Sequence, residues 1–231
     1  MKKSVLFFVA AILLGVVLQS CDREDNNGGN NESGTTSVQW VDLGLPSGLL
    51  WADRNVGANN PEDYGNYYAW GETTPKNFYD WSTYAYGNNY YALTKYCNDA
   101  SYGLNGFVDN LTNLQVSDDA ATVNLGSDAR TPTENEWQEL MDNTSSTWTT
   151  RNGVFGRLFT ASNGKSIFLP AVGTFVESSV DDAGEYGHFW SSTLGPDEPG
   201  YAWGFGFYSD EQYMSSFDRS VGFSVRAVRA R

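Results

Sequence analysis

Residues 201–207 alternate bulky and small side chains, and this pattern constrains the fold more than any other stretch of the chain. The order is Tyr-Ala-Trp-Gly-Phe-Gly-Phe. Successive side chains of a β-strand point to opposite faces of the sheet, so a period of two places every large ring on one face. The segment therefore predicts a strand whose bulky face fills a core, with Trp203, Phe205 and Phe207 buried in it.

The composition of the whole chain agrees with a strand-rich domain. Aromatic residues make up 15% of the 231 residues, 24 residues are glycine, and charged residues make up only 18%. The 14 Lys and Arg against 28 Asp and Glu give a net charge of 14 − 28 = −14. The phosphates of a nucleic acid repel such a chain, and no Lys/Arg cluster offsets that repulsion. Composition thus excludes a nucleic-acid binder, a coiled coil and a helical bundle.

The N-terminus has the features of a targeting segment. Lys2 and Lys3 precede an apolar run of 14 residues, 5–18, which is shorter than the roughly 20 residues that a transmembrane helix needs. The run ends in Leu-Gln-Ser-Cys21, which resembles the lipobox of bacterial lipoproteins. That resemblance implies a signal peptide over residues 1–20, cleavage before Cys21, and a lipid anchor on Cys21 that ties the protein to a membrane. An ordinary cleaved signal peptide is the alternative.

Residues 21–36 are expected to be a lipidated Cys followed by a flexible tether. The acidic residues 22–25 (DRED) resemble the surface-export signal of Bacteroidetes lipoproteins, which implies an outer-membrane protein that faces the cell exterior. Residues 26–36 contain no apolar side chain and cannot pack. One folded domain is expected over residues 37–231, with no internal boundary.

Cysteine and histidine are too scarce for several common sites. Acylation of Cys21 leaves only Cys97, so no intrachain disulfide is expected, and one Cys with His188 excludes a Cys/His zinc site. A Cys97 nucleophile with His188 as its base is one hypothesis, and a buried inert thiol is the favoured alternative. The sequence also has no Gly-x-Ser-x-Gly elbow. We expect no catalytic residue, no cofactor and no metal.

Two helices are predicted within the domain. In Thr131-Pro132-Thr133-Glu134 the pattern favours Thr131 as N-cap and Glu134 as its capping-box partner. Trp137, Leu140 and Met141 would then form an apolar stripe. A shorter helix is predicted over residues 118–124.

The remaining segments predict strands and loops. Strands are expected within residues 38–51, 154–161, 166–171, 189–193, 213–217 and 222–228. Residues 55–113 are rich in Asn, Gly, Tyr and Trp and predict a long irregular segment. Residues 177–187 predict an acidic loop. Residues 181–185 within it offer oxygen ligands for a hard cation, and a solvated loop is the favoured alternative.

Ordered blocks run through most of the domain, including residues 41–48 (VDLGLPSG), 55–58 (NVGA), 67–72 (YYAWGE), 130–137 (RTPTENEW), 163–171 (NGKSIFLPA), 190–193 (WSST) and 224–229 (SVRAVR). Together they resemble the Fibrobacter succinogenes major paralogous domain, a family of surface and secreted proteins. The block at 130–137 and the closing strand are also similar to the formylglycine-generating group.

The resemblance implies an α+β, C-type-lectin-like fold: a twisted, mainly antiparallel sheet with two helices and long aromatic, Gly- and Asn-rich loops. Formylglycine generators need a pair of redox cysteines, so that activity is not carried over to a chain with Cys97 alone. The Glu-Pro-Asn, Gln-Pro-Asp and Trp-Asn-Asp motifs of calcium-dependent lectins do not occur either.

In such folds the C-terminal strands and loops form the binding face. Aromatic faces stack on sugar C–H groups, and carboxylates accept hydrogen bonds from hydroxyls. Arg226 and Arg229 are expected to pair with carboxylates rather than to bind ligand. The candidate ligand-binding residues are therefore Trp190, Tyr201, Tyr208, Asp210, Glu211, Tyr213 and Phe217.

These observations predict a surface-tethered lipoprotein whose non-catalytic domain recognises an extracellular glycan or protein. One alternative is a glycan-processing enzyme that uses a carboxylate pair. Another is a structural surface protein without a defined ligand.

Overall fold

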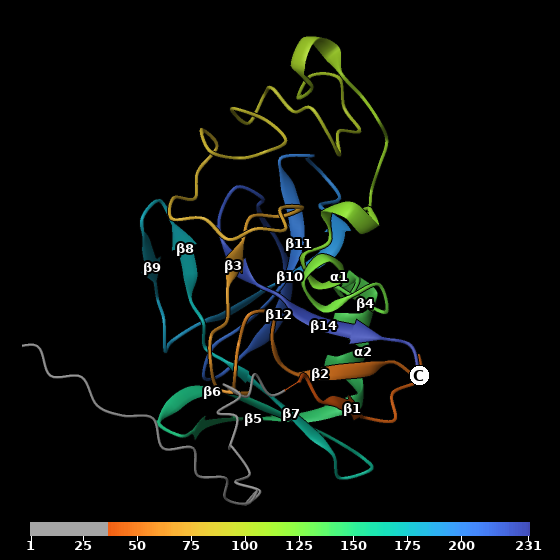
Figure 1. Ribbon diagram of the computed structural model, residues 1–231, viewed down its shortest axis with the longest axis vertical. Coiled ribbons are helices and arrows are strands. Elements are labelled where there is room, and N and C mark those ends of the chain that lie inside the picture. The colour runs from red at the N-terminus through yellow and green to blue at the C-terminus, as the bar shows by residue number, and fades with distance from the viewer. Residues whose placement is uncertain (1–36) are drawn as a thin grey trace, which may run out of the picture. The chain divides into compact units, whose positions relative to one another are not determined.

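The computed structural model describes residues 37–231, so the signal peptide, Cys21 and the tether predicted for residues 1–36 lie outside the described residues. The described part is an α+β fold of mostly antiparallel sheets with two α-helices (Figure 1). This confirms the predicted class at the level of α+β. None of the helices in residues 37–231 has both the length and the apolar character needed to cross a membrane.

The largest sheet contains the alternating segment. Its order is β12-β11-β10-β13-β3, and β10 runs antiparallel to β11 but parallel to β13. Phe205 and Phe207 of β11 are fully buried as predicted, whereas Trp203 is half-buried. The strands are β3 (Tyr67–Tyr68), β10 (Gly187–Leu194), β11 (Tyr201–Phe207), β12 (Gln212–Asp218) and β13 (Phe223–Ser224).

A second sheet has the order β1-β2-β14-β4. Its first two strands pair antiparallel, and residues 43–49 connect them. The closing strand β14 lies between β2 and β4 and so joins the two ends of the domain. The strands are β1 (Trp40–Asp42), β2 (Leu50–Asn55), β4 (Ala129–Arg130) and β14 (Arg226–Arg229).

Two smaller sheets complete the strands. β5 (Thr144–Arg151), β6 (Val154–Ala161) and β7 (Ser166–Pro170) form an antiparallel meander. β8 (Thr174–Val176) and β9 (Ser179–Asp181) form a hairpin. The expectation of a loop over all of residues 177–187 was therefore wrong. Glu177 adopts φ 51° at the hairpin turn, so an acidic residue takes a position that sequence patterns associate with glycine.

Both predicted helices exist, but the cap of the second lies two residues later than expected. α1 spans Ala120–Leu125 with Asp119 as N-cap, and α2 spans Glu134–Asn143. Thr133, not Thr131, is the N-cap of α2, and its capping-box partner is Glu136. Thr131 is buried, and its hydroxyl donates to Asp119 Oδ1 at 2.7 Å instead. The tertiary contact to Asp119 decides between two threonines that look equivalent in the sequence.

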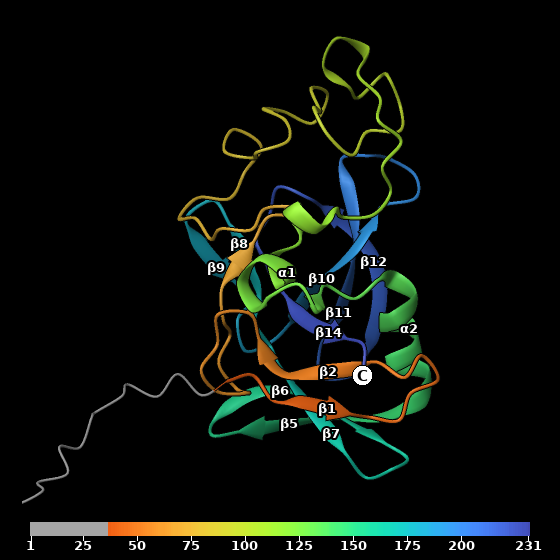
Figure 2. The ribbon, with the colours of Figure 1, turned by 45° about the vertical axis from the view of Figure 1, so that its right-hand side comes forward.

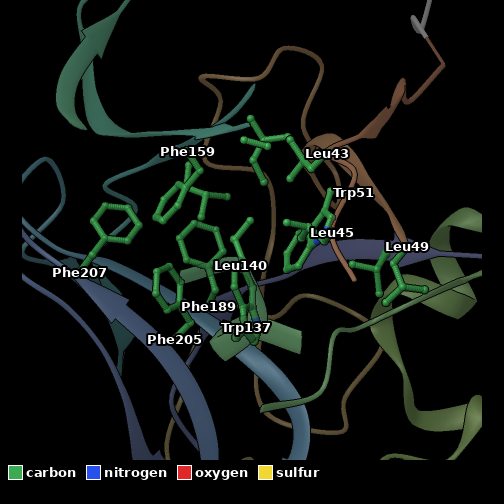
Figure 3. Packing of buried hydrophobic residues seen from close by; sticks show 14 of the residues in the cluster. Leu43, Leu45, Leu49, Trp51, Trp137, Leu140, Phe159, Phe189, Phe205 and Phe207 are labelled. Atoms are coloured by element: carbon green, nitrogen blue, oxygen red, sulfur yellow. The ribbon is translucent and has the colours of Figure 1, made fainter. Parts of the chain in front are cut away.

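The main hydrophobic core lies between α2, the second sheet, the β5–β7 meander and one face of the β10–β12 sheet (Figure 3). Trp137 of α2 stacks on Phe205 at 4.7 Å and meets Trp51 edge-on at 4.9 Å between ring centroids. Leu140 is fully buried beside it, as the predicted stripe requires, and Met141 packs at the margin.

Apart from β3 and a short 3-10 helix at Leu104–Gly106, the irregular segment predicted over residues 55–113 is observed, and its long loop over residues 86–113 projects beyond the ends of β10 and β11 (Figures 1 and 2). The β5–β7 meander lies at the opposite end of the domain in both views. Arg219 is fully buried and donates to the carbonyls of Lys95, Tyr96 and Pro199, which fastens this segment to the sheet.

The expected pairing of Arg226 and Arg229 with carboxylates was wrong. Arg226 is fully buried and donates to Asn55 Oδ1 and to the carbonyls of Ala52 and Phe168. It therefore connects the second sheet to the β5–β7 meander through neutral acceptors. The Arg229 guanidinium lies 4.5 Å from the ring centroid of Trp40.

Candidate functional site

Three segments that are distant in sequence form an aromatic pocket of about 300 Å³. Trp148 and Phe155 come from the β5–β6 hairpin, Tyr186 from the loop between β9 and β10, and Tyr208 from the turn between β11 and β12. Gly184, Glu185 and Ser209 complete the lining. We call this the aromatic pocket.

The rings of the pocket form two contacting pairs. Trp148 and Phe155 stack nearly parallel, with centroids 6.0 Å apart and an interplanar angle of 13°. Tyr186 lies 5.5 Å from Tyr208 between centroids. Phe155 remains 48% exposed although it is a large apolar residue. Exposed rings arranged in this way offer faces and edges for a ligand to stack on.

Arg157 holds the pocket together. This buried residue of β6 donates through Nε to the Tyr208 carbonyl and through an NH2 to the Ser209 carbonyl, both at 3.0 Å. Its other terminal nitrogen donates to Ser146 Oγ at 2.6 Å. Burial lowers the pKa of Arg157, and the nearby charge of Asp210 opposes that shift. The β11–β12 turn is thereby fixed against the β5–β6 hairpin.

Carboxylates border the aromatic pocket. Glu185 lines it and is exposed. The Tyr208 hydroxyl donates to Glu211 Oε2 at 2.6 Å, and this bond, together with partial desolvation, raises the pKa of Tyr208. Asp210 is exposed on the same turn. The pocket thus combines ring faces with hydrogen-bond acceptors, the two groups that the sequence argument assigned to ligand binding.

Four of the predicted ligand-binding residues gather near this pocket. Tyr208, Asp210 and Glu211 share the β11–β12 turn. Tyr213 is the second residue of β12, and its ring centroid lies 6.4 Å from that of Tyr208. Tyr213 is half-buried, and burial raises its pKa. Of the four, Tyr208 lines the pocket itself.

The other three predicted residues lie elsewhere. Trp190 was wrongly placed on a binding face: it is 1% exposed, stacks on Phe223 at 4.2 Å and donates from Nε1 to the Tyr68 carbonyl. Tyr201 lies at the other end of β11, against Tyr90 of the long loop. Seven residues of strand put it roughly 23 Å from Tyr208, too far to contact the same small ligand.

Phe217 packs into the domain rather than outward. Its ring meets Phe223 at 5.0 Å and His188 at 5.2 Å between centroids, and it lies over Gly204. It remains half-buried at the margin of the second hydrophobic cluster.

Cys97 and His188 do not form a catalytic pair. Cys97 is fully buried, its thiol donates to the Asp99 carbonyl at 3.1 Å, and burial raises the pKa of that thiol. This confirms the buried thiol. The His188 ring nitrogens lie 3.0 Å from Thr174 Oγ1 and 3.3 Å from the Tyr213 hydroxyl. Burial lowers the pKa of His188 to about 4, so the ring is neutral at pH 7.

Sequence reasoning missed Trp148, Phe155, Glu185 and Tyr186 as site residues. Trp148 was given no role, Phe155 was assigned to a strand, and Glu185 and Tyr186 were assigned to an acidic loop, where Glu185 was considered only as a ligand for a hard cation. A single aromatic residue in a strand of otherwise polar residues was the available signal at Trp148. Within residues 37–231, no three His, Cys, Asp or Glu side chains are grouped so that they could hold a metal ion.

Comparisons with known proteins give one match. A family model described as "Domain of unknown function (DUF8237)" matches residues 159–228. The matched range contains Tyr186, Tyr208 and Tyr213 but begins after Trp148 and Phe155. No curated protein matches the chain. No solved structure matches it.

Proposed function

We propose that this domain is a non-catalytic recognition module that binds a glycan through the aromatic pocket. The observation that carries the proposal is the convergence of four aromatic rings from three segments, next to the exposed Glu185. A sugar ring presents C–H groups to aromatic faces and hydroxyls to carboxylates, so its chemistry matches both features.

The way in which the pocket is built also supports recognition. Arg157 anchors the backbone of residues 208 and 209, so the rings are presented by a fixed turn rather than by a flexible loop. A preorganised site loses less conformational entropy on binding. Cys97 is buried and bonded to a carbonyl, and His188 faces Thr174 and Tyr213, so neither is poised for nucleophilic chemistry.

The setting of the domain is part of the same proposal. The lipobox-like residues that end in Cys21 favour a lipid-anchored protein of the outer membrane that faces the cell exterior. The tether of residues 26–36 would give the domain a reach of roughly 20 Å. We further propose that the α+β arrangement is C-type-lectin-like and related to the Fibrobacter succinogenes major paralogous domain, on the strength of the ordered sequence blocks.

The test is a glycan-binding screen of the full chain, followed by Tyr208→Ala. Removal of this ring should weaken binding about tenfold, since aromatic contacts contribute about 0.5–1.5 kcal/mol beyond the burial of their area. The matched control is Tyr91→Ala, which removes a tyrosine that is 66% exposed on the long loop.

Three results would contradict the proposal in whole or in part. Glycan binding that is equally sensitive to both variants would remove the aromatic pocket from recognition. Turnover of the bound glycan would show an enzyme instead. Binding of a protein, with no glycan bound on the array, would exclude glycans as the ligand class. The aromatic pocket would then remain as a candidate site for that protein.

A further inference from the structure

A second cleft, which shares no residue with the aromatic pocket, is lined by arginines. It has a volume of about 700 Å³ and lies between the end of α1, the strand β4 and the C-terminal residues. Its lining includes Arg130, Arg229 and Arg231, together with Thr122 and Asp128. Three guanidinium groups around one cleft are unexpected in a chain whose net charge is −14. We call this the arginine cleft.

Arg229 is the arginine of this cleft whose guanidinium has no hydrogen-bond acceptor among the described residues. Its guanidinium forms no hydrogen bond or ion pair within residues 37–231, and its Nε is buried without an acceptor. The group lies instead over the ring of Trp40, 4.5 Å from its centroid. Stacking on the indole fixes the plane of the guanidinium and leaves its N–H groups as donors.

The other two arginines are held by carboxylates. Arg130 donates from both terminal nitrogens to Glu136 at 2.6 Å, and Arg231 donates to Asp42 at 2.6 Å. Their charges are balanced, but both side chains stay partly exposed at the cleft, at 40% and 58%. Asp128 is an exposed acid on the same lining. Arg229 is therefore the arginine of this lining that has no carboxylate bound to it among the described residues.

We propose that the arginine cleft binds an oxyanion, the carboxylate or phosphate group of a ligand, with Arg229 as its main contact. A planar guanidinium matches the geometry of either group through two parallel N–H···O bonds. The Nε–H of Arg229, which is buried and has no acceptor among the described residues, belongs to the same guanidinium and reports on the contact. This site shares no residue with the aromatic pocket, so it stands independently of the proposed glycan recognition.

The experiment is an NMR titration that follows arginine Nε–H signals in the full chain, kept in detergent because of the apolar run at residues 5–18. Inorganic phosphate is added in one arm and acetate in the other. The Arg229 signal, assigned by its loss in Arg229→Lys, should shift and saturate in at least one arm. The buried Nε–H signals of Arg219 and Arg226 should stay in place, since neither residue lines the cleft.

Variants decide how specific the effect is. Arg229→Gln should weaken binding about tenfold, since a hydrogen bond to a charged group is lost. Arg151→Gln removes the same charge from an exposed arginine outside the cleft and should leave binding unchanged. Asp128→Asn should strengthen binding roughly twofold, because it removes a like charge from the lining.

An Arg229 signal that does not move in either arm would overturn the proposal, as would equal weakening by Arg229→Gln and Arg151→Gln. Both the titration of the unaltered chain and Asp128→Asn test the site even if Arg229→Gln does not fold.

Discussion

The two faces of the β10–β12 sheet are built from different chemistry. On one face Phe189, Phe205 and Met214 meet the apolar core under α2. On the other face, the register places His188, Gly206 and Tyr213 in one row across the three strands. The three residues named on the first face are apolar, whereas the second face carries an imidazole and a phenol hydroxyl among its rings.

Under the proposed recognition, one strand would serve both stability and ligand binding. The glycines of β11 leave space above the sheet, and the rings of Tyr213 and Phe217 on β12 occupy it. We call the face with His188 and Tyr213 the polar face, and the opposite one the apolar face. The polar face is therefore closed by aromatic side chains whose polar atoms bond to neighbouring side chains. The aromatic pocket begins where this strand pair ends, at Tyr208.

The largest effect is expected at the apolar face. Trp137→Ala should lower the free energy of unfolding by about 4 kcal/mol, because it removes a fully buried ring that stacks on Phe205 and contacts Trp51. Denaturant titration measures the loss. Val123→Ala on α1, where the side chain is 54% exposed, is the control and should change stability by less than about 0.5 kcal/mol. A loss below about 1 kcal/mol for Trp137→Ala would contradict this account of the core.

The polar face should respond to pH where the apolar face does not. Burial lowers the pKa of His188 from 6.5 to about 4 in the folded protein. Its contribution is fully present above pH 6.5 and is lost as the pH falls toward 4, since the unfolded chain takes up the proton first. Between pH 6.5 and 5 the loss should reach about 2 kcal/mol.

Unfolding free energies measured at pH 7, 6 and 5 test this, with His188→Gln as the comparison. The variant should show a flatter profile over that range. Equal slopes in both proteins would mean that the imidazole is not the group responsible.

A methyl group added to a glycine of β11 should disturb the polar face in particular. In Gly206→Ala the new Cβ would lie 2.6 Å from ring atoms of Tyr213, so the ring must move and stability should fall by about 1–2 kcal/mol. In a Tyr213→Leu background the same change should cost less. A double-mutant cycle gives the coupling, and a value below about 0.5 kcal/mol would show that the ring is not confined by the strand.

The smallest effect is expected at the helix that covers the apolar face. Thr133→Ala should destabilise the protein by about 1 kcal/mol through loss of the N-cap. Hydrogen exchange should increase in the first turn of α2 and remain unchanged on the polar face. Gln138→Ala, exposed on the same helix, is expected to have little effect. Increased exchange at His188 and Tyr213 would mean that the two faces are coupled.

The fold was predictable wherever local periodicity decides structure. The period of two in β11 and the stripe of Trp137 and Leu140 both follow from the sequence and are observed. The α2 cap was misplaced because Thr131 has a distant partner, Asp119, which no local pattern reveals. The neutral acceptors around Arg226 are long-range contacts of the same kind.

The candidate site was predictable in part. The turn with Tyr208, Asp210 and Glu211 could be recognised because aromatic and acidic residues adjoin a strand end. The sequence could not show that Trp148 and Phe155 meet this turn, since that contact joins two different sheets. Trp190 was misassigned because a strand tryptophan looks the same in the sequence whether its indole N–H reaches solvent or, as here, the Tyr68 carbonyl.

Arg157 binds backbone carbonyls of the β11–β12 turn and none of its side chains. The side chains at positions 208 and 209 are therefore free to change without loss of the anchor. The backbone anchor fixes the positions of these residues, whereas it does not constrain which side chains they carry. Under the proposed recognition, single substitutions on this turn would exchange one ligand for another while the shape of the turn stays set.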